Sequence, residues 1–193
     1  SDAVSALPPT TANGRRVRLA PGKPQRRPEL GGWTAPLPTL DGPTVVRSAA
    51  ADRRYGPDFS YGHHYVHGSL LVMLAAGLFF GVLAVAARIA PLRALLLRLV
   101  KKPGTGPTEA QMVAGWFKLR FVGRAGGQTV ETQVSGGDPG YRETSKMLAE
   151  SALCLVRDRD QLPTAGGVLT PAQAMGDVLI PRLQRAGLQF RRL

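Results

Sequence analysis

Residues 69–87 read SLLVMLAAGLFFGVLAVAA, an uncharged and almost wholly apolar run. Because an α-helix rises about 1.5 Å per residue, the run predicts a helix of about 28 Å, close to the roughly 30 Å hydrocarbon core of a bilayer. The run lies in mid-chain, unlike a secretory signal peptide. A membrane-associated helix is therefore one interpretation, and a buried core helix is the other.

A basic amphipathic segment follows directly and favours the membrane. Pro91 predicts a kink or a restart of the helix there, because proline has no amide hydrogen to donate. The leucines recur at the spacing of one helical face, as Leu92, Leu95, Leu96 and Leu99. The cations are Arg88, Arg93, Arg98, Lys101 and Lys102.

We expect residues 69–102 to form a monotopic membrane element. The arginines at 88, 93 and 98 would lie among anionic headgroups, although a solvated helix face is the alternative for them. Gly77 and Gly81 form a GxxxG pattern, which lets another helix approach closely. The side chains expected to enter the apolar layer include Leu70, Leu74, Phe79, Phe80 and Leu83.

The charge of the chain favours a polyanionic partner, since the formal net charge is +12 and the sequence pI is about 11.0. The cations are not interleaved with the aromatic side chains that stack nucleic-acid bases, so a membrane surface is expected and nucleic acid is not. The single cysteine, Cys154, excludes an internal disulfide and a cysteine-based zinc site. Its apolar surroundings predict a small core residue.

By composition the chain divides into two parts. Residues 1–42 are rich in Pro, Gly and Arg without an apolar period, so we expect an irregular basic segment. Residues 43–193 are expected to form one α+β domain, with an antiparallel or mixed sheet, packed helices and the membrane-associating helices. The stretch 55–65, YGPDFSYGHHY, predicts a strand with Phe59 and Tyr61 on one face.

The C-terminal third carries a predicted hairpin followed by two helices. Residues 113–122 and 128–135 alternate in apolarity around a Gly-rich loop, which predicts an antiparallel pair. A second helix begins at Thr170 with a capping box to Gln173, and it ends at Gly187 before a last short strand. The first helix follows GGDPGY and is expected to bury Met147, Leu148, Ser151, Ala152 and Leu155.

These residues alone do not disclose a reaction. His63, His64 and His67 suggest a metal site, but few carboxylates accompany them and adjacent strand residues point to opposite faces, so no metal is expected. The pattern at Gly104 and Gly106 does not complete a dinucleotide fingerprint, because residue 109 is glutamate and a helix precedes the pattern.

Several segments resemble the C-terminal half of saccharopine dehydrogenase-like oxidoreductases, most closely their trans-acting enoyl reductase branch. The resemblance runs from Gly31 onward in the family's order, and its last two segments are specific. The segments are GGWTAP at 31–36, RRYGPDFSY at 53–61, KPGTGPTE at 102–109, SGGDPGYRETSKMLAESALCL at 135–155 and GGVLTPAQAMGDVLIPRL at 166–183.

The resemblance implies an NAD(P)-dependent oxidoreductase of the enoyl reductase type, acting on lipid or polyketide-derived intermediates of the cell envelope. Family members carry an N-terminal Rossmann domain with a GxGxxG loop for NADP or NAD, a fingerprint that this sequence lacks. We therefore expect this chain alone to bind no cofactor and to be inactive. It would meet membrane lipid or a carrier-bound lipid at the cytoplasmic face of the membrane, and a homo-oligomer is compatible with the sequence. The alternative is a non-catalytic, membrane-associated module that retains the family fold.

Candidate substrate contacts lie in residues 136–147, GGDPGYRETSKM. Tyr141 and Lys146 are the candidate catalytic residues, as proton donors or carbonyl partners in a reductase site. Asp138, Tyr141 and Arg142 are the candidate substrate-binding residues. Asp-Pro-Gly-Tyr is also an ordinary helix-start sequence, so a purely structural role is the alternative.

Overall fold

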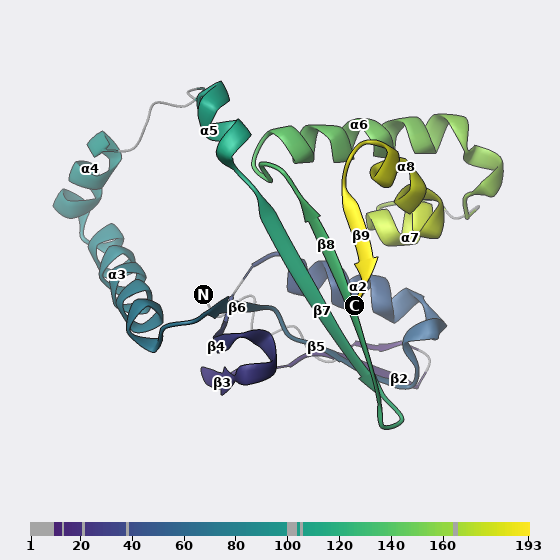
Figure 1. Cartoon of the computed structure of the whole chain (residues 1–193), viewed down its shortest axis with the longest axis horizontal. Coiled ribbons are helices and arrows are strands. Elements are labelled where there is room, and N and C mark those ends of the chain that lie inside the picture. The colour runs from purple at the N-terminus through teal and green to yellow at the C-terminus, as the bar shows by residue number, and fades with distance from the viewer. Residues whose placement is uncertain are drawn as a thin grey trace. The chain divides into compact units, whose positions relative to one another are not determined.

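The computed structural model describes residues 10–12, 14–20, 22–37, 39–99, 104, 106–163 and 166–193. The chain forms two compact units, Ser1–Thr105 and Gly106–Leu193, named here the N-terminal unit and the C-terminal unit. Each unit contains helices and strands, which confirms the mixed α+β class (Figure 1). The boundary between them falls within the segment KPGTGP and not at residue 42, where the composition changes.

Two small sheets form the framework of the N-terminal unit. In the first, β2 (Arg15–Leu19) is antiparallel to β1 (Thr10–Ala12) and parallel to β5 (Asp58–Tyr61). The second is antiparallel, in the order β3 (Gln25–Arg27), β4 (Gly32–Pro36) and β6 (His64–His67). Helix α2 (Asp41–Ala51) packs on the first sheet over a core of Val17, Val46 and Ala49. Short 3-10 turns lie at Pro28–Leu30 and Arg53–Tyr55.

The strands between residues 10 and 36 correct the prediction of an irregular segment over residues 1–42. In β2 the side chain of Val17 is fully buried between flanking arginines, which is the alternation of a strand. Arg18 forms an ion pair of 2.9 Å with Asp58 on β5, 40 residues away. Composition suggested an irregular basic segment, because the pairing of a cation such as Arg18 with a distant carboxylate becomes visible only in the folded sheet. Residues 1–9, 13, 21 and 38 lie outside the described residues.

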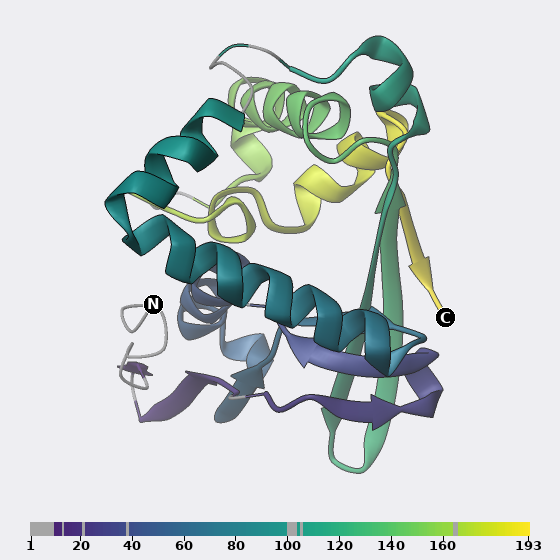
Figure 2. The same cartoon turned by 90° about the vertical axis from the view of Figure 1, so that its left-hand side faces the viewer.

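The apolar run forms helix α3 (Leu70–Arg88), and α4 (Ala90–Leu99) follows it. Ile89 interrupts the two helices with extended backbone angles, φ −94° and ψ 116°, so the restart predicted near Pro91 is confirmed. By length and composition α3 could cross a membrane, with a mean hydropathy of 2.6, and only Met73 in it is buried. Figure 2 shows that the two helices meet at a sharp angle. Lys101 and Lys102 lie outside the described residues.

The C-terminal unit is built on an antiparallel sheet in the order β7-β8-β9. The hairpin prediction is confirmed, since β7 and β8 pair along their length through a turn at Gly126 and Gly127, both with positive φ. Thr170 caps its helix as predicted. That helix is interrupted, however, by a 3-10 turn at Gly176–Val178. The elements are α5 (Glu109–Ala114), β7 (Phe117–Ala125), β8 (Gln128–Gly136), α6 (Arg142–Arg157), a 3-10 turn (Arg159–Gln161), α7 (Pro171–Met175), α8 (Leu179–Arg185) and β9 (Gln189–Arg192).

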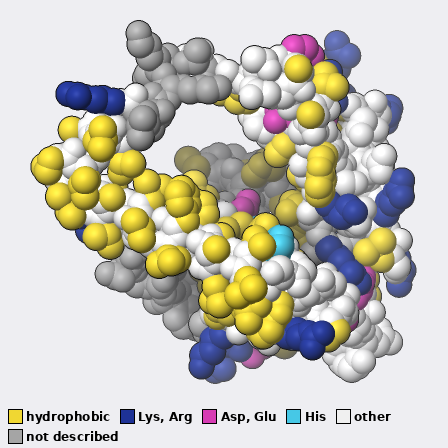
Figure 3. Space-filling view, turned by 60° about the vertical axis from the view of Figure 1, so that its left-hand side comes forward, with side chains coloured by type: hydrophobic (Ala, Val, Ile, Leu, Met, Phe, Trp, Pro, Cys, Tyr) yellow, Lys and Arg dark blue, Asp and Glu magenta, His cyan; other side chains and the backbone are white. Residues whose placement is uncertain are grey.

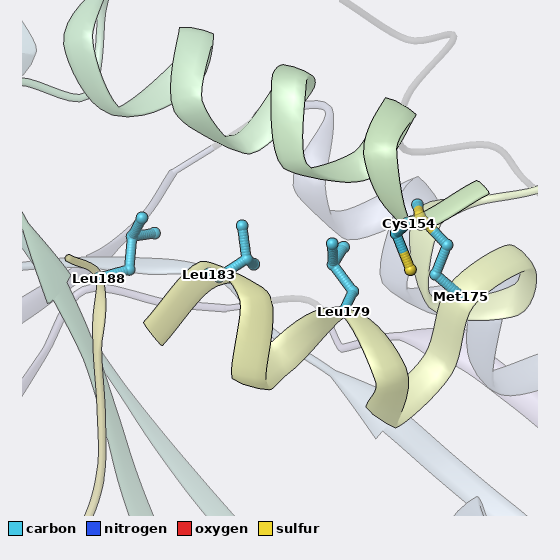
Figure 4. Close-up of a cluster of buried hydrophobic side chains, with 5 residues drawn as sticks. All are labelled: Cys154, Met175, Leu179, Leu183 and Leu188. Carbon is cyan, nitrogen blue, oxygen red and sulfur yellow. The ribbon is translucent and has the colours of Figure 1, made fainter. Parts of the chain in front are cut away.

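The core of the C-terminal unit lies between α6, α7 and α8 and extends onto the sheet through Phe117 and Phe190. Cys154 is completely buried there, which confirms the prediction for this cysteine. Figure 4 shows the buried cluster, which consists of Cys154, Met175, Leu179, Leu183 and Leu188.

The buried face of α6 differs from the predicted stripe of residues 147, 148, 151, 152 and 155. Leu148 is 72% exposed and Leu155 is 48% exposed, whereas Glu143 and Cys154 are buried. The helix is turned toward α8 by Arg182, whose guanidinium bridges Glu150 at 2.9 Å and Asp158 at 2.5 Å. The spacing of apolar residues along α6 does not predict this orientation, because the side of the helix that faces α8 carries carboxylates.

Candidate functional site at the start of helix α6

The turn between β8 and α6 is organised by one carboxylate. An oxygen of Asp138 accepts hydrogen bonds from the backbone amides of Tyr141, at 2.7 Å, and Arg142, at 3.1 Å. These bonds, with the Tyr141 amide foremost, hold the pKa of Asp138 below its usual value. Asp138 therefore stays charged and satisfies amides at the helix start that would otherwise lack partners.

A partly buried ion pair lies in the first turns of α6. The Nζ atom of Lys146 donates to Oε1 of Glu143 at 2.8 Å, and the Glu143 side chain is only 7% exposed. Its second oxygen, Oε2, is buried without a hydrogen-bond partner among the described residues. A buried carboxylate oxygen without a donor is costly, so the Lys146 ammonium group at the other oxygen is needed to offset the burial of Glu143.

Two glycines make room for that carboxylate. A Cβ atom added at Gly137 would lie 3.0 Å from Oε1 of Glu143, and one added at Gly136 would lie 2.8 Å from the ring of Phe117. The glycine pair before Asp138 is thus explained by the close approach of Glu143 and Phe117. Sequence reasoning missed Glu143, although its i, i+3 spacing to Lys146 is the available signal.

Tyr141 and Arg142 face a different neighbour, the short helix α5. The Tyr141 ring approaches Gly106, since a Cβ atom added there would lie 3.5 Å from the ring, and the side chain is 55% exposed. Arg142 forms an exposed ion pair of 3.5 Å with Glu109. A Cβ atom added at Gly115, which follows α5, would lie 2.9 Å from Cβ of Asp138.

The structure therefore places the predicted residues together at the start of α6, but their side chains contact two different parts of the C-terminal unit. Lys146 points to Glu143 and to Gly187 after α8, whereas Tyr141 lies against Gly106, which precedes α5. The phenol and the ammonium group do not share a hydrogen bond. Both are partly exposed, so either can donate a proton or a hydrogen bond to a bound carbonyl group.

The start of α6 lacks the features that bind a dinucleotide. A glycine-containing turn between a strand and a helix can hold pyrophosphate on free helix amides. Here the Asp138 carboxylate already occupies the amides of Tyr141 and Arg142 and would repel a phosphate. In addition, β8 is antiparallel to both of its neighbours, unlike the strands of a βαβ unit. The start of α6 therefore does not fit the pyrophosphate of NADP or NAD.

The three histidines each have different surroundings. Nδ1 of His63 lies 3.0 Å from the Tyr61 hydroxyl, and Nδ1 of His67 accepts from the amide of Ser69 at 3.0 Å. The ring of His64 lies against Gly22 and Gly62. Burial, followed by the charge of Asp41, raises the pKa of Tyr61. Within the described ranges, no group of three or more His, Cys, Asp or Glu residues could hold a metal ion.

The residues predicted to meet a membrane lie on α3 and α4. Leu74, Phe79 and Phe80 are each more than half exposed. Leu70 is half-buried at the start of α3, and Leu83 is 36% exposed. Arg88 ends α3, while Arg93 and Arg98 are exposed on α4.

This chain is similar to mycobacterial proteins that are named as trans-acting enoyl reductases. A putative trans-acting enoyl reductase of Mycobacterium tuberculosis is 36% identical over 89% of this chain and 45% of its own length. A trans-acting enoyl reductase of Mycobacterium ulcerans is 34% identical, and one of Mycobacterium bovis is 32% identical, each over 83% of this chain and 41% of the relative. The chain thus spans about half the length of these relatives. No family model matches it, and no solved structure does.

Proposed function

We propose that this chain is the substrate-side half of an NAD(P)-dependent enoyl reductase of the saccharopine dehydrogenase-like type. Its substrate would be a lipid or polyketide-derived intermediate of the cell envelope, held in the membrane or on a carrier. The observation that carries the proposal is the similarity, over 89% of the chain, to a putative trans-acting enoyl reductase. Because the chain corresponds to 45% of that relative, a nucleotide-binding domain would be supplied by the rest of the protein or by a partner.

The residues at the start of α6 would act on the substrate carbonyl. An enoyl group is conjugated to a carbonyl, whose oxygen gains negative charge when the double bond is reduced. A donor near that oxygen stabilises the charge, and an acid can deliver the proton that completes the reduction. Lys146, oriented by Glu143, and the exposed phenol of Tyr141 are the donors that this chain offers. Arg142 would bind an anionic part of the substrate or its carrier.

The alternative function is a non-catalytic membrane module. It is favoured by the occupied amides at the start of α6, which leave no free helix amides for the pyrophosphate of NADP or NAD at this turn. The two candidate functions make different predictions. Only the reductase requires that reduction of an enoyl substrate appear when a nucleotide-binding half is supplied.

The proposal is tested with the natural full-length protein, or with this chain and its N-terminal half supplied together. Consumption of NADPH is followed with a long-chain 2-enoyl thioester as substrate. We expect Lys146→Ala or Tyr141→Ala to lower turnover by about 10²-fold or more, as loss of a general acid does. Lys118→Ala is the control, because this exposed lysine lies on β7 and outside the site.

Two results would overturn the proposal. Absence of NADPH binding and of reduction in the complete protein would favour the non-catalytic module. Unchanged turnover in both Ala variants, with normal folding, would remove the start of α6 from the reaction.

A further inference from the structure

Helix α3 is apolar around its whole circumference and exposed on nearly all of it. Only 6% of its most apolar window is buried, and Leu78, Phe79 and Phe80 are 71%, 63% and 65% exposed. In a space-filling view, hydrophobic side chains cover α3 and α4 almost continuously (Figure 3). A partner packed on one side would leave the opposite side of such a helix in water, so its surroundings must be apolar all round.

The first end of α3 is bounded by aromatic side chains on the second sheet of the N-terminal unit. Trp33 on β4 pairs in register with His67 on β6, and the Tyr65 ring stacks with the His67 ring at 6.2 Å. His67 is joined to the helix start through the Ser69 amide. Tryptophan and tyrosine concentrate at the boundary between hydrocarbon and headgroups, because their rings are apolar and carry one polar atom.

The other end of α3 is bounded by cations. Arg88 is its last residue, and the exposed Arg93 and Arg98 follow on α4. Leu92 and Leu95 give α4 an apolar side that continues that of α3. An apolar groove of about 550 Å³ follows the junction from Gly77 and Gly81 to Ile89 and Leu92. A concave apolar surface beside arginines complements an acyl chain with an anionic headgroup.

We propose that α3 and α4 dock this chain on an anionic lipid bilayer. In this arrangement α3 lies below the headgroups of one side of the bilayer, with Trp33 and Tyr65 at headgroup level near its start and α4 in the plane of the headgroups. Because both ends of this helix of about 28 Å lie at the same headgroup layer, α3 runs roughly parallel to the membrane surface. The proposal does not depend on any catalytic activity.

Insertion from one side follows from the extent of similarity to the relatives. The match covers 89% of the chain and must therefore include residues on both sides of α3. If those residues belong to one half of an enzyme, a helix that crossed the bilayer would separate them on opposite surfaces. A helix that lies along one side of the bilayer avoids that separation.

The experiment measures binding of the purified chain to phosphatidylcholine vesicles with and without phosphatidylglycerol. We expect sedimentation with the anionic vesicles and retention after washes in high salt and carbonate. The variant Phe79→Asp/Phe80→Asp should lose retention. The variant Arg93→Gln/Arg98→Gln should bind the anionic vesicles more weakly, by roughly fivefold per arginine. Arg191→Gln/Arg192→Gln is the matched control, since it removes two exposed arginines from β9 and should bind as the original chain does.

Three outcomes would overturn the proposal. The first is recovery of the original chain in the supernatant, including the case where light scattering shows an oligomer in which a second copy covers α3. The second is equal weakening by the β9 control, because binding would then reflect net charge alone. Circular dichroism of each variant shows whether the fold is retained.

The third outcome concerns the side of the membrane. Cysteines are placed by Lys23→Cys and, separately, Arg191→Cys in a Cys154→Ala background, and inside-out membrane vesicles from producing cells are treated with an impermeant maleimide. Both positions should react if the chain enters from one side. Protection of either one until detergent is added would show a crossing helix instead.

Discussion

Oε1 of Glu143 lies 2.8 Å from Nζ of Lys146, and this pair is the tightest contact between the predicted catalytic lysine and the fold. Glu143 is buried, whereas the Lys146 side chain is 40% exposed. The lysine is therefore held through its ammonium group, while its side chain remains partly open to solvent. Such an arrangement orients a donor without burying it.

The geometry of this pair should depend on Gly137. A Cβ atom at this position would lie 3.0 Å from the Glu143 carboxylate, so Gly137→Ala should displace Glu143 and destabilise the C-terminal unit by about 1–3 kcal/mol. Gly140→Ala is the matched control, since its Cβ would lie 3.6 Å from Asp138, an ordinary contact distance. Urea denaturation followed by circular dichroism measures both. Equal stability of the two variants would show that Glu143 does not require the glycine.

The orientation of α6 gives a second prediction, for a pair of leucines. Leu183 lies in the core beside Cys154, so Leu183→Ala should lower the free energy of unfolding by about 2–5 kcal/mol. Leu148 is 72% exposed on the opposite side of α6, and Leu148→Ala should change the free energy by no more than about 0.5 kcal/mol. Denaturant titration of both variants checks the orientation. A larger loss at Leu148 would mean that the helix is turned as its apolar pattern suggested.

Local sequence signals were sufficient to predict several helices and strands of the fold. Alternation identified the hairpin of β7 and β8, and capping chemistry identified the helix start at Thr170, because both depend on residues close together in the chain. The break before Pro91 is local in the same way. Such elements can be predicted from one sequence.

Features that rest on distant partners were missed. Strand β2 exists through its pairing with β5, and the buried side of α6 is set by Arg182 on α8. At the candidate site, the sequence indicated a helix start at Asp-Pro-Gly-Tyr but not the burial of Glu143, because burial depends on how Gly136 and Gly137 approach α6. The different surroundings of Tyr141 and Lys146 likewise depend on Gly106 and Glu143, whose contacts the sequence did not reveal.

Acid should destabilise the C-terminal unit through two aspartates. Hydrogen bonds from Arg182 lower the pKa of Asp158, and backbone amides lower that of Asp138. Since both folded pKa values lie below the unfolded value of about 3.9, their stabilisation is complete above that pH and is lost as the pH falls through the folded values. Denaturation midpoints measured downward from pH 7 should therefore decline most steeply below about pH 4. Asp158→Asn should be less stable at pH 7 and show a shallower decline, and an unaltered decline would exclude Asp158 as a cause.

The junction between the second sheet and α3 depends on Gly32. A Cβ atom at this position would lie 2.4 Å from the backbone carbonyl oxygen of His67, which cannot turn aside as a flexible side chain does. Gly32→Ala should therefore separate β4 from β6 and destabilise the N-terminal unit by about 3 kcal/mol. Gly68→Ala is the matched control, because open space surrounds its Cβ position. Limited proteolysis and thermal unfolding should distinguish the two variants, with cleavage near the start of α3 accelerated in Gly32→Ala alone. If the protein tolerates Ala at both positions, β4 does not hold the base of α3 as the structure indicates.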